Sequence, residues 1–226
     1  MLTLRRSKFL VLLVCLLGLF VVQPMLPRLP GGNASIHLDV ALSAVLLAGI
    51  WSISHRTSVV LFCVALVSVG LGAAWFAHAE NSARLAMVAI GCTLVFLVFT
   101  VGSVLRHVLE AAEVTTDTIL GGVCAYLLLA IAWALIYGIL ERLQPGSFSS
   151  SGPLLFVADQ AGSLLAPDLI YYSLFTLTTI GPQDMHPVSG PALAWTGVEA
   201  MAGQFYVAVL IARLVGLHTS QRSGSS

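Results

Sequence analysis

The chain has 226 residues, of which 58% are hydrophobic and 9% are charged, and its mean hydropathy is +0.97. Soluble domains carry about 25% charged residues, so this composition excludes an ordinary soluble protein. It predicts an all-α membrane protein with lipid as a partner. Ten Lys and Arg residues balance ten Asp and Glu residues. A net charge of zero supplies no field to hold a nucleic-acid backbone, so no nucleic-acid partner is expected.

Six apolar segments that can form transmembrane helices follow one another along the chain. Their residue ranges are 9–25, 38–54, 59–77, 85–105, 118–140 and 192–214. A helix needs about 20 residues to cross roughly 30 Å of hydrocarbon. A further apolar stretch, 169–180, is too short to cross and is typical of a re-entrant or interfacial segment. The sequence therefore predicts six transmembrane helices, with a re-entrant helix and loop between the fifth and the sixth.

The basic residues orient these spans. With both termini in the cytoplasm, seven of the ten Lys and Arg residues fall on the cytoplasmic side: Arg5, Arg6, Lys8, Arg56, Arg106, Arg213 and Arg222. The other three, Arg28, Arg84 and Arg142, fall outside. This asymmetry satisfies the positive-inside rule and predicts a multi-pass protein of the cell membrane with both termini cytoplasmic.

The first segment has an alternative interpretation as a cleaved signal peptide. A basic start, an apolar stretch and small residues at Gly32 and Ala34 are features of such a peptide. The apolar run is long for a signal peptide, however, and is followed by Pro24 and Pro27. Cleavage would leave the topology of the downstream spans unchanged.

The re-entrant segment has a clear start and a clear stop. Pro167 and Asp168 are typical of a first helical turn, where a carboxylate faces the positive end of the helix dipole. Gly181 and Pro182 stop the helix and turn the chain back. Irregular backbone at membrane depth is tolerated only where it is buried in protein or lines water, and the negative end of a short helix favours a cation.

These residues resemble a known family. The run Tyr172-Ser-Leu-Phe-Thr-Leu-Thr-Thr-Ile-Gly181, followed by Asp184 and Pro187, is similar to the pore signature of bacterial two-transmembrane-pore potassium channels. The last span extends the resemblance with Glu199, Gly203-Gln-Phe-Tyr206 and Ile211-Ala-Arg-Leu-Val-Gly-Leu-His218. The likeness covers about residues 114 to 218, whereas the first four spans match the family only in number.

The resemblance implies a homotetramer around a central pore. It divides the chain into a four-helix membrane region (1–113), a pore domain (114–220) with pore helix and filter, and a short cytoplasmic tail (221–226). The candidate filter comprises seven residues: Thr178, Thr179, Ile180, Gly181, Pro182, Gln183 and Asp184. The resemblance implies that carbonyls of Thr179, Ile180, Gly181 and Pro182 replace the hydration shell of a permeant monovalent cation, K⁺ or Na⁺.

The candidate filter departs from the family pattern at three positions, of which Ile180 in place of valine keeps the shape and branching of the side chain. The family sequence reads Thr-Val-Gly-Tyr-Gly-Asp, whereas this chain has Pro182 and Gln183 in place of Tyr-Gly. Proline fixes φ and has no phenol to anchor the filter. Glutamine replaces a glycine whose left-handed backbone costs other residues about 1–2 kcal/mol. A wider, less potassium-selective outer filter is expected, and the alternative is a non-conducting, channel-derived protein or modulatory subunit.

Three residues of the candidate filter, and His186 beside it, have two interpretations each. The hydroxyls of Thr178 and Thr179 either serve the filter or cap the preceding helix. Asp184 either forms a ring of four carboxylates that concentrates cations or is a solvated loop acid. His186 either tunes that ring near neutral pH or is merely exposed.

The last span carries two more candidates. Glu199 is an intramembrane carboxylate, which either contacts the ion or, as we favour, holds the pore helix from behind the filter. Gly203 is a possible gating hinge, with Ala208, Ile211 and Val215 lining the pore below it. The alternative for Gly203 is close helix packing, which small residues serve in membrane helices.

Other functions find little support in the sequence. Four isolated cysteines and six scattered histidines have no metal-ligand spacing, and we find no phosphate loop and no nucleophile motif. We therefore expect no enzyme activity, no cofactor and no metal beyond a permeant cation at Thr179, Ile180 and Gly181. The span 85–105 lacks the arginine repeat of a voltage sensor. A secondary transporter would have paired interrupted helices, and this chain shows one.

Overall fold

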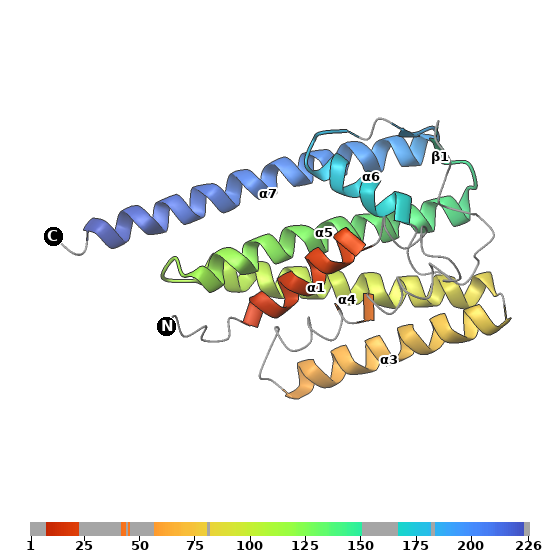
Figure 1. Cartoon of the computed structure of the whole chain (residues 1–226), viewed down its shortest axis with the longest axis horizontal. Helices are drawn as coiled ribbons and strands as arrows, with labels where there is room; N and C mark the ends of the chain where they lie inside the picture. Colours follow the sequence, from red (N-terminus) through yellow and green to blue (C-terminus); the bar gives the residue numbers. More distant parts are fainter. Residues whose placement is uncertain are drawn as a thin grey trace.

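The computed structural model describes residues 8–22, 42–43, 45, 57–80, 82–150, 167–181 and 184–223. Its elements in chain order are α1 (Lys8–Val22), α3 (Thr57–Glu80), α4 (Ala83–Glu110), α5 (Thr116–Leu143), β1 (Phe148–Ser150), α6 (Pro167–Leu177), β2 (Met185–Pro187) and α7 (Gly190–Ser223). The regular structure in this part of the chain is helical apart from one small antiparallel sheet, in agreement with the predicted all-α class. Figure 1 shows the arrangement.

Four helices are long and apolar enough to cross a membrane. They are α4 and α5 over their whole lengths, α3 within Val60–Ala77 and α7 within Gly190–Leu217. The predicted spans 59–77, 85–105, 118–140 and 192–214 coincide with these four helices. The first predicted span, 9–25, overlaps α1, whose apolar part Phe9–Val21 is shorter. The second, 38–54, lies outside the described residues except for 42, 43 and 45.

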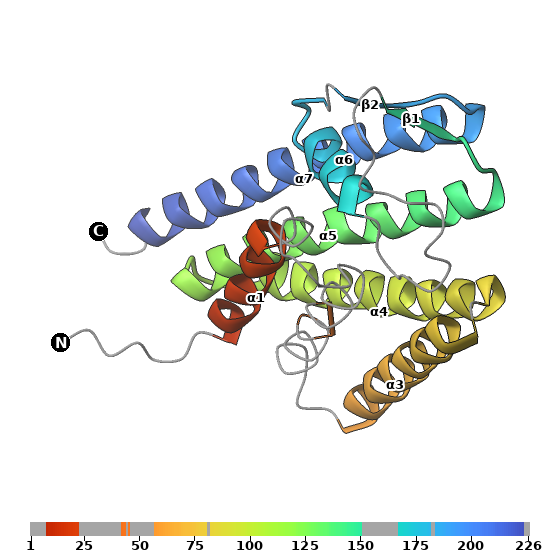
Figure 2. The ribbon, with the colours of Figure 1, turned by 45° about the vertical axis from the view of Figure 1, so that its right-hand side comes forward.

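The four long helices form a row. Contacts join α3 to α4, α4 to α5, and α5 to α7, while α6 contacts both α5 and α7. Figure 2, in a second orientation, shows the same row with α6 beside α7 and α1 crossing α5. The consecutive helices α3, α4 and α5 run antiparallel to one another, as their short connections require.

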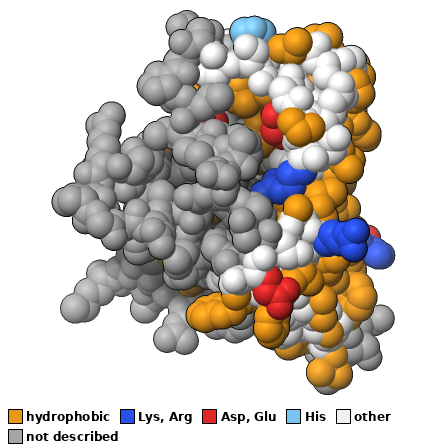
Figure 3. Space-filling model, turned by 90° about the vertical axis from the view of Figure 1, so that its right-hand side faces the viewer, with side chains coloured by type: hydrophobic (Ala, Val, Ile, Leu, Met, Phe, Trp, Pro, Cys, Tyr) orange, Lys and Arg blue, Asp and Glu red, His pale blue; other side chains and the backbone are white. Residues whose placement is uncertain are grey.

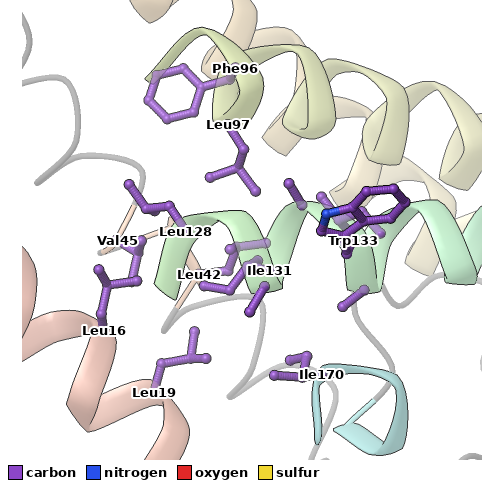
Figure 4. Packing of buried hydrophobic residues seen from close by; sticks show 14 of the residues in the cluster. Leu16, Leu19, Leu42, Val45, Phe96, Leu97, Leu128, Ile131, Trp133 and Ile170 are labelled. Carbon is purple, nitrogen blue, oxygen red and sulfur yellow. The ribbon is translucent and has the colours of Figure 1, made fainter. Parts of the chain in front are cut away.

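Helix α5 lies at the centre of the packing. In Figure 4, Leu16 of α1, Leu97 of α4 and Ile170 of α6 approach Leu128 and Ile131 of α5, and all five side chains are buried. Packing of this kind stabilises membrane helices, because lipid tails leave little hydrophobic drive between them. The helices around α5 thus share one core.

Glycines let neighbouring helices approach α5 closely. A Cβ atom at Gly121 would lie 3.2 Å from Val108 and 3.3 Å from Phe9, and one at Gly122 would lie 3.1 Å from Leu210. Small residues serve this purpose in membrane helices. Helices α1, α4 and α7 therefore meet α5 near the same level.

Helix α1 also contacts α6. The Sγ atom of Cys124 on α5 donates to the carbonyl of Phe9 at 3.4 Å, and the hydroxyl of Tyr171 on α6 donates to the carbonyl of Phe20 at 2.9 Å. The two ends of α1 are thereby tied to two different helices. Helix α1 packs with the predicted pore domain, although the sequence assigned its residues to the N-terminal membrane region.

The ends of α5 follow familiar local chemistry. Thr115 caps the helix, since its hydroxyl accepts from the Thr118 backbone N–H at 3.2 Å. After the last turn, Pro145 and Gly146 reverse the chain, and Gly146 takes a φ of 84°. Figure 3 shows this end of the molecule, where charged side chains lie among hydrophobic ones. Charges at helix ends are expected where helices leave an apolar layer.

Candidate functional site

Helix α6 is short and lies between α5 and α7, as Figure 1 shows. Its 11 residues extend over about 16 Å, roughly half the thickness of a hydrocarbon layer. Asp168 lies in its first turn, where a carboxylate suits the helix dipole. The buried side of α6 consists of Leu169, Ile170, Tyr172, Ser173, Thr176 and Leu177. The helix observed over Pro167–Leu177 agrees with the helix start and stop signals in the sequence.

The chain folds back on α6 directly after the helix. The backbone N–H of Thr179 donates to the carbonyl of Thr176 at 2.9 Å. The next two N–H groups, of Ile180 and Gly181, both donate to the carbonyl of Phe175, at 3.0 and 3.1 Å. Thr179 and Gly181 have φ values of 60° and 74°. This left-handed backbone is natural for glycine but costs threonine about 1–2 kcal/mol.

These hydrogen bonds fix the direction of two carbonyl groups. In a trans peptide, the N–H and the preceding C=O point in opposite directions. Because the N–H groups of Ile180 and Gly181 point to Phe175, the carbonyls of Thr179 and Ile180 point away from α6. Within the described part of the chain, no hydrogen bond ends on either carbonyl, and both residues are exposed. The turn thus presents two successive oxygen ligands on its open side.

The two threonine hydroxyls have different contacts. Thr178 Oγ1 donates back to the carbonyl of Leu174 at 2.8 Å, as expected of a capping hydroxyl. Thr179 Oγ1 donates to the carbonyl of Thr178 at 2.7 Å and accepts from Gln204 Nε2 of α7 at 3.2 Å. The candidate filter is therefore attached to α7 through Thr179.

The small sheet holds the chain beyond the candidate filter. Strands β1 and β2 pair antiparallel, with Ser149 opposite His186, and the N–H of Val188 donates to the carbonyl of Ser147 at 2.8 Å. The Glu141 carboxylate in turn accepts from two backbone N–H groups, of Gly146 at 2.7 Å and Phe148 at 3.2 Å. The chain after the candidate filter is thus anchored to the end of α5.

The other predicted filter residues have separate outcomes. Asp184 is exposed just before β2 and His186 is exposed within β2, which agrees with both interpretations of each residue. The predictions for Pro182 and Gln183 fall outside the described residues.

A hollow of about 360 Å³ lies next to the turn. It is lined by Tyr172, Thr176, Thr179, Gly181, Met185, His186, Pro187, Thr196 and Ala200.

Glu199 of α7 is completely buried and links three helices. Its Oε2 accepts from the hydroxyl of Tyr137 on α5. Its Oε1 lies 2.5 Å from Oγ of Ser173 on α6, and that Oγ lies 2.7 Å from the carbonyl of Ala130 on α5. This arrangement supports the interpretation in which Glu199 holds the short helix from behind.

A second set of contacts lies beside Glu199 and its partners Tyr137 and Ser173. Tyr172 Oη and Thr196 Oγ1 are 2.7 Å apart, and Thr196 donates to the carbonyl of Ala192 at 2.7 Å. The rings of Tyr137, Tyr172 and Phe148 pack edge to face with centroids 5.1 to 5.2 Å apart. Sequence reasoning missed Tyr137 and Ser173, although polar side chains within apolar helices are a signal that could have identified them.

Gly203 lies against the end of α6. A Cβ atom at this position would lie 2.1 Å from the carbonyl oxygen of Leu177, which also accepts from Tyr126 of α5 at 2.9 Å. This contact supports the packing role of Gly203, while its role as a hinge stays a prediction. Ile211 and Val215, predicted to line a pore, are exposed on α7.

No protein-family model, curated protein or solved structure matches this chain.

Proposed function

We propose that this chain is one subunit of a tetrameric, potassium-channel-like cation channel of the cell membrane, which passes K⁺ or Na⁺ passively. The observation that carries the proposal is the pair of carbonyls, of Thr179 and Ile180, that point away from α6 on an exposed turn. Backbone carbonyls that replace a hydration shell are the means by which potassium channels bind their ions. No cofactor is required for this activity.

The depth of the turn supports the proposal. Helix α6 ends at Leu177, which contacts Gly203, and Gly203 lies midway along the apolar segment Gly190–Leu217 of α7. If α7 crosses the membrane, the exposed backbone after α6 lies near the membrane centre. Exposed polar backbone at that depth must face water or protein rather than lipid. A re-entrant pore helix followed by a water-filled path fits this requirement.

The exposure of α7 supports a homotetramer. Only four of the 28 residues in its apolar segment are buried, and exposed residues include Met201, Phe205, Val209, Ile211 and Val215. Two carbonyls from one chain do not surround a cation, whereas four subunits supply rings of them. In such an assembly, the same helix that faces the pore also packs on the neighbouring subunit.

The remaining parts of the proposal concern topology. The two segments 9–25 and 38–54 join the four long apolar helices to give six spans. The distribution of Lys and Arg puts both termini in the cytoplasm. Potassium selectivity is expected to be weak, because Pro182 and Gln183 replace the Tyr-Gly pair of the family.

The reversal potential of the purified protein in planar bilayers tests this function. With K⁺ on one side and Na⁺ on the other, we expect current that reverses near zero. The matched control is the double variant Pro182→Tyr, Gln183→Gly, which restores the family filter and is expected to reverse near the K⁺ Nernst potential.

Each other outcome has a definite meaning. Reversal of the native protein near the K⁺ potential would show that selectivity survives without Tyr-Gly. Current in the double variant alone would support the non-conducting alternative. Silence of both proteins, or a monomeric mass for the detergent-solubilised protein, would contradict a tetrameric channel.

A further inference from the structure

The oxygens around Glu199 allow a count of protons. Three of them form a chain, from the carbonyl of Ala130 to Ser173 Oγ to Glu199 Oε1, with separations of 2.7 and 2.5 Å. Two oxygens this close need a hydrogen between them. The chain therefore needs two hydrogens, and its members supply them unequally: a serine hydroxyl has one and a backbone carbonyl has none.

The missing hydrogen has one source. If Ser173 donates to Ala130, the contact between Ser173 and Glu199 needs a hydrogen from the carboxyl group itself. The other carboxyl oxygen, Oε2, already accepts from the hydroxyl of Tyr137. A neutral carboxylic acid fits both contacts: Oε1–H donates to Ser173, and the Oε2 carbonyl accepts from Tyr137.

We propose that Glu199 is a neutral acid in the folded protein, and that its proton is the link by which α7 and α5 hold α6 in position. Glu199 is a positioning residue in this proposal, since it contacts α6 and not the candidate filter. Its burial is complete, and no cation is hydrogen-bonded to it among the described residues. A buried carboxylate without a cation is costly, whereas a neutral acid needs only hydrogen-bond partners.

The groups that face Glu199 from the neighbouring helices agree with this assignment. Among the residues that the structure describes, the titratable ones are phenols: Tyr126 and Tyr137 of α5, and Tyr172 of α6. Ser173 completes the surroundings on α6, and it lies five residues before Thr178, where the candidate filter begins. Loss of the proton would leave two acceptors facing each other at Ser173. We therefore infer that alkaline pH, by removing this proton, releases α6 and disturbs the turn that follows it.

Infrared difference spectroscopy of the full-length protein tests the proton directly. We expect the wild-type spectrum at neutral pH, minus that of Glu199→Gln, to contain the C=O stretch of a protonated carboxylic acid. Tyr137→Phe should shift this band to higher frequency, because the carbonyl loses its hydrogen-bond donor. Where Glu199→Gln does not fold, the Tyr137→Phe shift alone identifies the band. Absence of any protonated-acid band sensitive to either variant would overturn the proposal.

The effect on ion flow rests on the proposed channel function and has its own readout. Glutamine imitates the neutral acid, with an oxygen for Tyr137 and an N–H donor for Ser173. At neutral pH we expect Glu199→Gln to conduct like the wild type. At alkaline pH the wild-type current should decline, whereas the current of Glu199→Gln should not. Glu199→Ala, which leaves both hydroxyls without this partner, should lower the current about tenfold or more.

The two readouts separate the two ideas. Val198→Ala is the matched control, because Val198 neighbours Glu199 in sequence and is exposed. An infrared band without current from any variant would contradict the channel and leave the proton assignment standing. Loss of current in Glu199→Gln equal to that in Glu199→Ala would contradict the neutral-acid link itself.

Discussion

Helices α5 and α7 have the same apolar length but opposite surroundings. Each contains a 28-residue segment that can cross a membrane, yet 14 of these residues are buried in α5 and four in α7. Helix α5 contacts α1, α4, α6 and α7, whereas α7 contacts α6, β2 and one side of α5. Apolar composition therefore indicates that a helix can be covered by lipid or by protein, but it does not indicate which of the two covers it.

The buried positions of α7 form a narrow stripe. Ala192, Glu199, Gly203 and Leu217 are buried, and Tyr206 and Leu210 are half-buried. Their spacings of seven, four, three, four and seven residues place them on one face of a helix. Most other residues of α7 are exposed. In the proposed tetramer, this free surface faces the pore and the neighbouring subunits.

The largest expected effect comes from the core of α5. Leu128→Ala removes a side chain that is 1% exposed, and the cavity should lower the free energy of unfolding by about 2–5 kcal/mol. The matched change on α7 is Val209→Ala, at a residue that is 53% exposed, which should stay within about 0.5 kcal/mol. Titration with a denaturing detergent, under conditions that dissociate oligomers, gives both values. Equal losses would contradict the difference between the two helices.

Gly203→Ala should give the next largest effect. Its Cβ would lie 2.1 Å from the Leu177 carbonyl, so α7 and the end of α6 must separate. Overpacking of this kind costs about 1–3 kcal/mol. The unfolding midpoint in detergent and the yield of oligomer measure the loss.

The control for Gly203 lies on the same helix. A Cβ at Gly197 has no atom within 4 Å, so Gly197→Ala should be neutral or slightly stabilising, because alanine favours helix by up to about 1 kcal/mol. If both substitutions behaved alike, Gly203 would not be the contact that seats α6, and its role as a hinge would gain weight.

Two tyrosine hydroxyls link α5 with its partners, and their removal should have a moderate effect. Tyr206 of α7 donates to the carbonyl of Gly122 at 2.6 Å, and Tyr126 of α5 donates to the carbonyl of Leu177 at 2.9 Å. Tyr206→Phe and Tyr126→Phe keep the ring contact between these residues. Each should lower stability by about 0.6 kcal/mol, the average for such bonds in membrane helices. Phe205→Leu, at an exposed ring, serves as the control in the same detergent titration.

Much of the helical arrangement could be predicted from the sequence. Four spans and the helix between 167 and 177 were expected near their observed positions, because apolar length, charges and the Gly-Pro stop are local signals. Thr178 and Thr179 also lie together at the end of that helix, as expected.

The long-range contacts could not be predicted in the same way. Strands β1 and β2 have three residues each and are separated by more than thirty residues, so neither carries a periodic pattern. The partners of Glu199 come from two other helices, and helical periodicity does not say which residues of those helices meet it. The attachment of α1 to Tyr171 depends likewise on the tertiary packing.

The smallest expected effect on stability concerns Gln204, where the exposed face of α7 meets the candidate filter. Gln204 Nε2 donates to Thr179 Oγ1 at 3.2 Å, and both residues are exposed. Gln204→Ala should therefore change the free energy of unfolding by less than about 0.5 kcal/mol. In the proposed channel, however, the substitution removes the hydrogen bond from Gln204 to the Thr179 hydroxyl, which lies beside the Thr179 carbonyl. The relative permeability of K⁺ and Na⁺ should therefore change. Met201→Ala, at an exposed residue of the same helix without a hydrogen-bonding group, should leave permeability unchanged. A large loss of stability without a change in permeability would place the importance of Gln204 in folding, and α7 would then resemble α5 more than its exposure suggests.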